Sequence, residues 1–550
     1  MFLRTIHKKN GKRYCYIFKS VYDKKRKYPV HKRIADLSGF SDEVILQIEK
    51  LIKGELSTFE NKKSAIQDFV RISESRYFGP LLILKEFLDE LELEKLFFLD
   101  KRATKDLKAL ILARAAEPLK CRSEFRTAEW LKNSGMHFLL GGDAVQWDRN
   151  RFYPLLSLLS KNWVNVEDHL WTKRESAPRL YFYDITSTYF EGKGGTLANL
   201  GYSRDEKNGN VQILVALLAD ENSIPVSVRI LPGNTKDSTT VKEMVSQIKF
   251  RFNAEKITII MDRGMRTEAN IETIKNFGLD YIIALPHGKA RELLKDKERL
   301  EWEELFDQRS LAEWTDGNKR YVVCRNPFTA EKDKKTLEKI LLRAEKRLNK
   351  LSEMIKKGRL LNKDKILART IRILTQTKTE KYFDYIVDNN KLEYSRNELA
   401  KITDLYAGSY VLESSLLQTD KKEIDSAYRS ERDIEEIFRT CKDELKLRPN
   451  FHKNDETIFG HIYLTFLSYL LRKKLEIKLK RCEINESAET FLQKFENITI
   501  NRVEINKDSD YLITTPNRNQ IILLNLLGIK MDYKKRGKAC SLTKKDNNTS

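Results

Sequence analysis

Residues 181–188 read YFYDITST, a run of aromatic and β-branched residues that is typical of a β-strand. One acidic residue, Asp184, interrupts the run. A buried carboxylate is costly unless a metal ion or a cation pairs with it, whereas on an edge strand it can simply face solvent. The stretch therefore predicts a strand, and it leaves two interpretations of Asp184, a functional residue or a solvent-facing one.

The segments that follow predict the rest of an α/β sheet. Further strands are expected at 211–219, 224–231, 256–262 and 281–285, and helices at 239–250 and 267–276. The first three strands are joined by short connections and should be antiparallel, while the later strands alternate with helices and should be parallel. The order β-β-β-α-β-α-β is that of the ribonuclease H-like fold. We therefore expect an α/β protein with a mixed five-stranded sheet flanked by helices.

A second carboxylate, Asp262, ends the strand at 256–262. Alone, it is best interpreted as a cap of the following turn. In the expected strand order, however, the first and fourth strands are neighbours, and their carboxyl ends are where such sheets gather ligands. Asp184 and Asp262 would then meet at the centre of the sheet, where two like charges need a divalent cation between them.

The charge of the chain points to nucleic acid. Lys and Arg number 102 against 80 Asp and Glu, a net charge of +22, which attracts DNA or, as a second choice, an anionic membrane. The apolar run at 462–471 is too short to span a bilayer, and the N-terminus lacks the apolar segment of a signal peptide. We expect a cytoplasmic protein with no membrane partner, associated with the nucleoid when it is bound to DNA.

The six cysteines and seven histidines are scattered along the sequence, without a CxxC or an HxxxH pair. This spacing argues against a disulfide framework and against a structural zinc site. Any metal site is therefore expected to use oxygen ligands, which favours magnesium or manganese.

Residues 290–420 break the α/β rhythm and predict an insertion. Its centre carries apolar residues at heptad spacing: Leu337, Leu341, Ala344, Leu348, Leu351 and Ile355. Residues 331–372 hold 15 Lys and Arg against 6 Asp and Glu. The seam predicts either a helical hairpin within the chain, which we favour, or a dimerisation helix.

A third acidic candidate lies in YRSERDIEEIFR, residues 428–439. Glu435 follows the apolar Ile434, and Lys442 lies two helical turns further along the same face. A surface helix with ion pairs is the alternative interpretation of the segment, and for Glu436 it is the preferred one.

Five segments together carry a specific resemblance: YFYDITSTYFEG, GYSRDEKNGNVQILVALL, IPVSVRILPGNTKDSTTV, ITIIMDRGM and YRSERDIEEIFRTCKDELKLRPNFH. Over residues 1–475 the chain resembles bacterial insertion-sequence transposases of the DDE type, from the group with an insertion before the catalytic glutamate. The resemblance implies that Asp184, Asp262 and Glu435 form the acidic triad. The Tyr-x2-Arg-x3-Glu-x6-Lys signature of that group is partly met, because Glu431 occupies the Arg position.

The resemblance also implies the chemistry and the partners. Two Mg²⁺ or Mn²⁺ ions would be held by Asp184 as the bridging ligand, with Asp262 on one ion and Glu435 on the other. Water would free a 3′-hydroxyl at the end of the element, and this hydroxyl would attack target DNA. The expected partners are the terminal inverted repeats and the target DNA, bound by a homodimer in the synaptic complex. The candidate DNA contacts are Tyr428, Arg429, Arg432, Lys442, Arg448, Arg204 and His452.

Three residues after the third strand, Asn234, Thr235 and Asp237, are also expected near the site, although Asp237 is equally suited to cap the next helix. Two rival functions remain open. One is a ribonuclease H-like nuclease without strand transfer, and the other is a catalytically decayed transposase that only binds DNA.

The expected organisation divides the chain into six segments. These are a small β unit at 1–45, a mainly helical DNA-binding region at 46–175, the first part of the catalytic core at 176–290, the insertion at 291–420, the second part of the core with the glutamate helix at 421–476, and a C-terminal region with a basic tail at 477–550. The tail from Tyr533 onward is expected to be disordered.

Overall fold

The computed structural model describes residues 1–7, 13–23, 27–53, 70–97, 99–141, 147–205, 207, 209–252, 257–295, 300–388, 391–505 and 508–531. Two compact units divide the chain: Met1–Leu82, Asn133–Val145 and Leu492–Ser550 make the first, and Ile83–Lys132 and Gln146–Phe491 the second. The basic tail from Tyr533 onward lies outside the described residues, and the six segment boundaries stay predictions. Among the described helices, none has the length and apolarity needed to cross a membrane.

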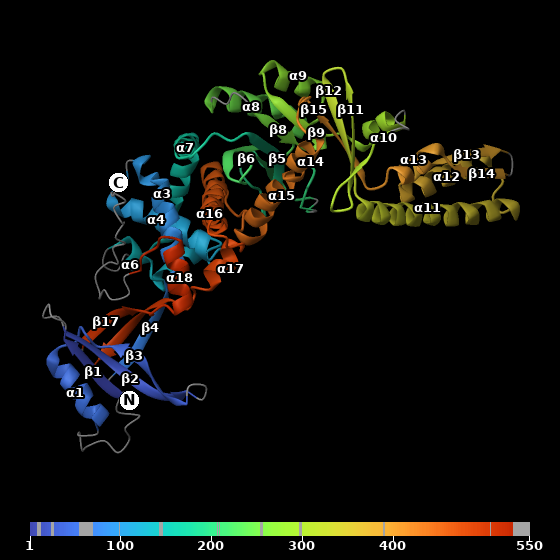
Figure 1. Ribbon diagram of the computed structural model, residues 1–550. Coiled ribbons are helices and arrows are strands. Elements are labelled where there is room, and N and C mark those ends of the chain that lie inside the picture. The colour runs from blue at the N-terminus through green and yellow to red at the C-terminus, as the bar shows by residue number, and fades with distance from the viewer. Residues whose placement is uncertain are drawn as a thin grey trace. The chain divides into compact units, whose positions relative to one another are not determined.

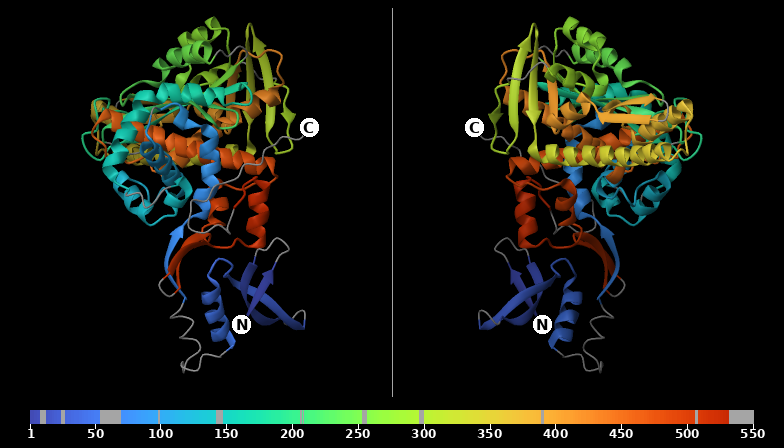
Figure 2. Two further views of the ribbon diagram at one scale, coloured as in Figure 1. Left: turned by 90° about the vertical axis from the view of Figure 1, so that its left-hand side faces the viewer. Right: turned by 90° about the vertical axis from the view of Figure 1, so that its right-hand side faces the viewer.

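The first unit begins with a small antiparallel sheet. Its strands, in spatial order, are β1 (Phe2–His7), β2 (Arg13–Asp23) and β3 (Tyr28–Asp36), and α1 (Asp42–Lys53) lies beside them (Figure 2). Helix α1 has acidic residues in its first turn and lysines in its last, which suits the helix dipole. Its buried face, Ile45 and Ile48, packs with Cys15 and Leu37.

A second sheet of the first unit joins distant parts of the chain. Strand β4 (Val70–Tyr77) pairs antiparallel with β16 (Thr499–Ile505), which also pairs with β17 (Asp508–Ile513). Strand β4 lies in the region that we expected to be mainly helical. Strand β4 pairs with a strand more than 400 residues later in the chain, so its only local signal is a short alternation of apolar and polar residues.

The second unit contains the expected sheet. Its core strands are β5 (Leu180–Tyr189), β6 (Gln212–Asp220), β7 (Pro225–Pro232), β8 (Thr258–Met261) and β9 (Asp280–Ala284). They lie in the order β9-β8-β5-β6-β7, with β5, β8 and β9 parallel and β6 antiparallel to both of its neighbours (Figure 1). This is the strand order of the ribonuclease H-like fold, and the prediction is confirmed.

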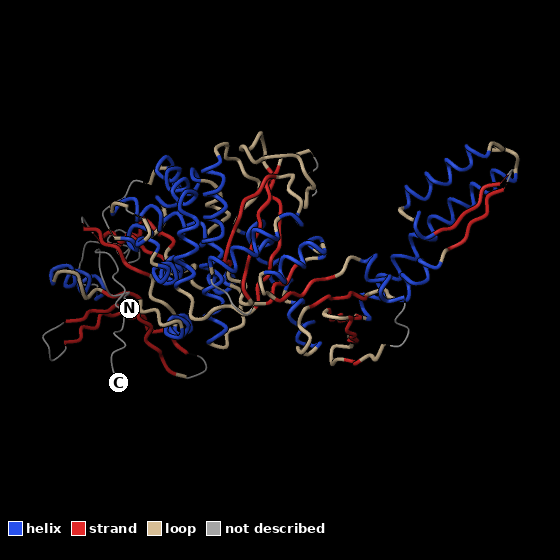
Figure 3. Tube along the Cα trace, turned by 90° about the horizontal axis from the view of Figure 1, so that it is seen from above, coloured by secondary structure: helices blue, strands red, loops and turns tan. Residues whose placement is uncertain are grey.

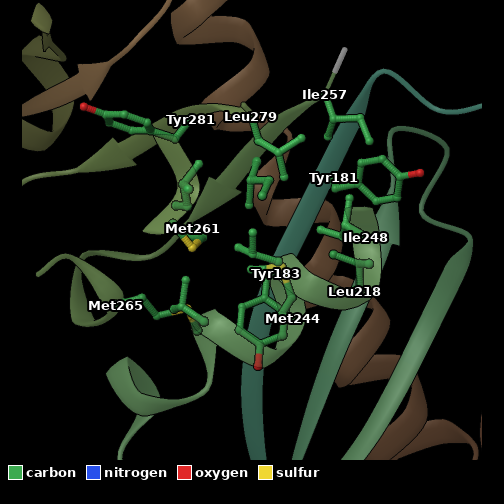
Figure 4. Packing of buried hydrophobic residues seen from close by; sticks show 14 of the residues in the cluster. Tyr181, Tyr183, Leu218, Met244, Ile248, Ile257, Met261, Met265, Leu279 and Tyr281 are labelled. Atoms are coloured by element: carbon green, nitrogen blue, oxygen red, sulfur yellow. The ribbon is translucent and has the colours of Figure 1, made fainter. Parts of the chain in front are cut away.

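Helices α8 (Val241–Ser246) and α9 (Glu268–Asn276) supply the packing for one face of this sheet. Alternate residues of β5, among them Tyr181 and Tyr183, are buried there with Met244 and Met261 (Figure 4). Each large apolar side chain buried in this way contributes about 1.5–3 kcal/mol. Because strand side chains alternate between faces, Asp184 belongs to the opposite face, on the side of the helix that carries Glu435.

The insertion extends the sheet. Beyond β9 the order continues antiparallel through β15 (Ser409–Ser414), β12 (Lys319–Arg325), β11 (Ser310–Asp316) and β10 (Glu303–Glu304). The five-stranded core thus becomes part of a nine-stranded sheet. Helix α10 (His287–Lys295) connects β9 to the added strands.

Between β12 and β15 the chain forms a group with a core of its own. It contains α11 (Pro327–Lys356), α12 (Lys363–Thr377), β13 (Phe383–Asp388), β14 (Lys391–Arg396) and α13 (Glu398–Leu405) (Figure 3). The heptad residues from Leu341 to Ile355 are buried in this core, together with Ile366, Leu374, Tyr382 and Phe383. The seam therefore packs inside the chain, as the helical-hairpin interpretation predicts.

A helical layer completes the second unit. Helix α16 (Asp455–Arg481) packs against α7 (Phe152–Thr172) and α4 (Lys101–Ala116), with α5 (Glu124–Lys132) beside α4. Most of α16 is buried, which explains its apolar sequence. Gly460 is required at the crossing with α7, because a Cβ there would lie 2.1 Å from the carbonyl oxygen of Leu156.

Candidate active site

The register of two parallel strands brings the first two acidic candidates together. Tyr183 of β5 is paired with Met261 of β8, so the next residues along the two strands are Asp184 and Asp262. Neighbouring strands are about 4.8 Å apart. The two carboxylates therefore start from adjacent backbone positions on the same face of the sheet.

Asp184 is a largely buried carboxylate with an altered acidity. Burial raises its pKa from the ordinary value of 3.8 to about 7; the hydrogen bond from the Ile185 amide opposes the rise, and the Asp262 charge adds to it. That amide donates to Asp184 Oδ1 at 2.7 Å. Arg204 lowers the pKa and Asp237 raises it, so both of these residues lie within electrostatic reach of Asp184. Burial and the two neighbouring carboxylates thus all disfavour the charged form of Asp184.

Asp262 follows the last residue of β8 and is about half exposed, 3.6 Å from the Arg263 guanidinium. The space beside Gly264 shows which carboxylates surround Asp262. A Cβ at Gly264 would lie 4.0 Å from Asp262 Oδ2 and 3.9 Å from Asp237 Oδ2. Asp237 thus stands close to Asp262 as well as to Asp184.

Asp237 is held by Arg204 rather than used as a helix cap. One terminal nitrogen of Arg204 donates to both carboxylate oxygens, at 2.7 and 2.6 Å. The short 3₁₀ turn at Asp237–Thr239 has Lys236 as its N-cap residue, so the capping interpretation of Asp237 is wrong. The Arg204 amide donates to Ser187 Oγ of β5 at 3.3 Å, which fixes this pair beside the strand that carries Asp184.

The glutamate helix α15 (Glu431–Arg439) follows α14 (Lys421–Arg429) and packs against β5. Ile434 and Ile437 are buried on its inner side, and Glu435 is exposed on the flank. Glu436 instead makes a surface ion pair with Arg439 at 3.1 Å, which confirms the interpretation made from the sequence.

Lys442 ties the end of this helical segment to the loop that carries Arg204. It lies in a π-helical turn (Thr440–Glu444) that continues α15, and its Nζ donates to Asp205 Oδ1 at 2.7 Å. Asp205 adjoins Arg204, so this π-helical turn contacts the loop whose Arg204 pairs with Asp237. Turns of this kind are frequent at functional sites. Glu435, exposed on α15, stays a prediction as the third acidic residue.

Asp205 holds two basic side chains at once. Besides Lys442 it pairs with Arg448, which also contacts Asp443 at 2.9 Å. Only 3% of the Asp205 side chain is exposed. Burial lowers the pKa of Lys442, and the hydrogen bond to Asp205 opposes that shift. Asp205 lies in the GYSRD segment, and its position next to Arg204 is the only signal in the sequence that points to these ion pairs.

The other candidate DNA contacts are spread around the helix. Tyr428 lies with its ring 5.6 Å from the ring of Tyr410. Arg429 and Arg432 are exposed, and Arg429 is 3.7 Å from Asp307. These three residues stay predictions as DNA contacts.

His452 is placed in a buried cluster. Its Nε2 is 3.6 Å from Glu124 Oε2, and its side chain is 13% exposed. Its ring makes an edge contact with Tyr153 and lies 5.3 Å from that of His461. Burial lowers the pKa of His452; Glu124 opposes and Arg114 reinforces this shift.

Comparison with known proteins identifies the family of the chain. Residues 176–471, more than half of the chain, match the family model described as the transposase DDE domain. The chain belongs to this family. The chemistry of the family is phosphoryl transfer on DNA, generally with divalent metal ions. The expected family is confirmed, and no curated protein matches the chain.

Two solved structures are similar to the chain at low identity. One is a piggyBac transposase synaptic complex with hairpin DNA, at 9% identity and a TM-score of 0.35, covering 76% of this chain and 76% of that one. The other is a Mos1 transposase paired-end complex with the left transposon end, at 12% identity and a TM-score of 0.14, covering 31% of this chain and 56% of that one.

Proposed function

We propose that this DNA transposase binds the ends of its mobile element and cleaves and joins DNA strands through Asp184, Asp262 and Glu435. The observation that carries the proposal is the β5–β8 register, which sets Asp184 beside Asp262 with Asp184 largely buried. Two carboxylates so placed favour a divalent cation between them. Glu435, on the helix α15 that packs against β5, is proposed as the third carboxylate.

The donor set fits hard cations. All three proposed ligands are carboxylates, which suit Mg²⁺ or Mn²⁺ and leave coordination positions for water and phosphate oxygens. Two such ions, when bound, activate the attacking oxygen and stabilise the leaving oxygen of an in-line displacement. Asp184 would bridge them, with Asp262 and Glu435 each holding one. The Arg204–Asp237 pair positions a cation and a fourth carboxylate at the edge of the site.

The protein's own cations orient the DNA. Lys442 and Arg448 share Asp205, so their charge is partly neutralised until a backbone phosphate competes for them. Arg429, at the end of α14 and 3.7 Å from Asp307, and Arg432, at the start of α15, are both exposed. Phosphate contacts of this type fix the register of the duplex without reading its sequence.

The proposed reaction has two steps at one site. Water frees a 3′-hydroxyl at the element end, and this hydroxyl then attacks a phosphodiester of target DNA. Two copies of the chain would bind the two terminal inverted repeats as a homodimer. A nuclease would stop after the first step, so joined products distinguish a transposase from a nuclease.

The test uses the full-length protein, Mg²⁺, a labelled duplex of the element end taken from DNA flanking the gene, and a target plasmid. Wild-type protein should cleave the end and join it to the plasmid. Asp262→Asn should lose both products and still shift the duplex in a binding gel. Binding without cleavage by wild-type protein would favour the decayed alternative, and cleavage without joining would favour the nuclease.

A further inference from the structure

A second group of possible metal ligands lies in the helical layer. Glu124 of α5, His452 before α16 and His461 of α16 each offer one ligand atom, and these atoms all lie within 4.8 Å of one another. The exposed fractions of Glu124 and His461 are 3% and 4%. The histidines are scattered in the sequence, but the turn into α16 brings the rings of His452 and His461, nine residues apart, to 5.3 Å from each other.

Several polar atoms around this group have no hydrogen-bond partner among the described residues. Two are acceptors, Glu124 Oε1 and His461 Nδ1, and three are donors, Arg114 Nε, Arg114 Nη2 and Asn450 Nδ2. Each buried polar atom left unpaired costs about 1–3 kcal/mol. The two acceptor atoms can bind a cation, and the three donor atoms can bind an anion or a hydroxyl oxygen.

The orientation of His461 suits a metal ligand. Its Nε2 lies 3.2 Å from the carbonyl oxygen of Lys446, so the ring proton belongs on Nε2. This leaves the Nδ1 lone pair free and buried. A metal-binding histidine is usually held in this way, by a backbone carbonyl that accepts from its other nitrogen.

We propose that Glu124, His452 and His461 form a site for a divalent transition metal ion, zinc by its donor chemistry, with a solvent hydroxide as the fourth ligand. Two imidazole nitrogens and one carboxylate are a typical zinc set and a poor magnesium set. The zinc–ligand distances of about 2.0–2.2 Å require the three ligand atoms to draw slightly closer on binding.

Arg114 supports the hydroxide. Its guanidinium is fully buried and lies within electrostatic reach of Glu124. Its Nη1 reaches only the Leu445 carbonyl oxygen, at 3.5 Å. A metal ion without a hydroxide would leave two cations, the ion and Arg114, against the single negative charge of Glu124. A bound hydroxide would add a negative charge and would accept hydrogen bonds from the unpaired N–H groups of Arg114.

The ion would tie α5 to the segment that follows the glutamate helix. His452 lies shortly after Lys442 and Arg448 in the sequence. His461 Nε2 donates to the carbonyl oxygen of Lys446, which lies between Lys442 and Arg448. Metal binding here would thus stabilise the segment that carries these basic residues. The site is independent of the triad, because its ligands are mostly nitrogen and the triad's are all oxygen.

The test measures metal content and the cobalt spectrum of full-length protein. Protein stripped with EDTA and refilled with Zn²⁺ should retain one ion per chain after gel filtration. Refilled with Co²⁺, it should show the strong visible absorption of tetrahedral cobalt, whereas octahedral cobalt on carboxylates and water absorbs only weakly. At free zinc 100 times the Kd, the melting temperature should rise by about 3–5 °C.

Matched variants locate the ion. His461→Gln and His452→Gln should each lower zinc affinity by more than about 100-fold and abolish the tetrahedral spectrum. Asp184→Asn and the exposed His31→Gln should keep both. If His461→Gln does not fold, the more exposed His452→Gln decides. The proposal is overturned if the wild type retains no ion, in which case buried water satisfies these atoms, or if the two histidine variants retain it.

Discussion

Substituting Asp184 by Asn should remove a pH-dependent instability from the metal-free protein. The folded-state pKa of Asp184 is raised from 3.8 to about 7, so the folded protein holds this proton more tightly than the unfolded chain does. The stabilisation is complete below pH 4 and is lost as the pH rises through 7. At about 1.4 kcal/mol per pKa unit, the loss between pH 4 and pH 8 is at most about 4 kcal/mol.

The assay is thermal unfolding in EDTA at pH 5, 6, 7 and 8, for wild type and Asp184→Asn. The variant should gain stability relative to the wild type with each step from pH 5 to pH 7, and the difference between the two melting temperatures should level off by pH 8. Mg²⁺ should raise the melting temperature of the wild type at pH 8 and leave the variant nearly unchanged. Glu436→Gln, on the exposed surface, should follow the wild type.

Parallel curves for wild type and Asp184→Asn across this pH range would refute the reasoning, because a carboxylate with an ordinary pKa contributes no such slope. Asp262→Asn provides an intermediate case. It removes a neighbouring charge that raises the pKa of Asp184 and keeps the burial that contributes most.

Three further predictions concern the helix, the DNA and the loop. Glu435→Gln should lower the Mg²⁺-dependent cleavage rate by at least about 100-fold in a gel assay of element ends, while Glu436→Gln should keep the wild-type rate. The reverse result would show that Glu436, and not Glu435, is the catalytic glutamate. DNA affinity, measured by fluorescence anisotropy, should fall by roughly 10³–10⁵ between 50 and 200 mM salt if about 6–10 phosphates are contacted; a shallow slope would contradict this use of the charge. Asp205→Asn leaves Lys442 and Arg448 without their shared buried partner, so it should lower the free energy of unfolding by about 3–5 kcal/mol in urea titrations; unchanged stability would mean that the pair is dispensable.

The sequence predicted what depends on local pattern. The strands from β5 to β9 are apolar and separated by clear turns, so their order, and with it the meeting of Asp184 and Asp262, followed from chain topology. The glutamate helix was likewise visible in the spacing of Ile434 and Ile437.

Pairings between distant segments were out of reach of the sequence. Strand β4 finds its partner more than 400 residues later, and Lys442 contacts Asp205 across more than 200. The Glu124–His461 grouping spans a similar distance. In each case the sequence around one residue does not indicate its partner, and only the folded structure brings the two together.

The insertion can be separated from the sheet at a defined place. The Asn326 amide donates to the Gly408 carbonyl oxygen at 3.0 Å, and Arg325 faces Ser409 in the β12–β15 pair. The two ends of the inserted group therefore meet. Its apolar side chains are buried against one another, so removal of the whole group exposes little of the remaining sheet.

We therefore predict that replacing 327–405 by Asn-Gly, a favoured hairpin turn, leaves a folded core. Tyr406 is kept because its hydroxyl donates to the Leu294 carbonyl oxygen at 3.0 Å. The shorter deletion of 331–372 should instead aggregate, since it strips both helices from Tyr382 and Phe383. Circular dichroism and gel filtration distinguish these outcomes. The folded variant that lacks 327–405 should cleave element ends more slowly, because it lacks the basic helices. Cleavage at the wild-type rate would mean that the insertion is a passive spacer. Failure to fold would mean that the insertion is part of the core.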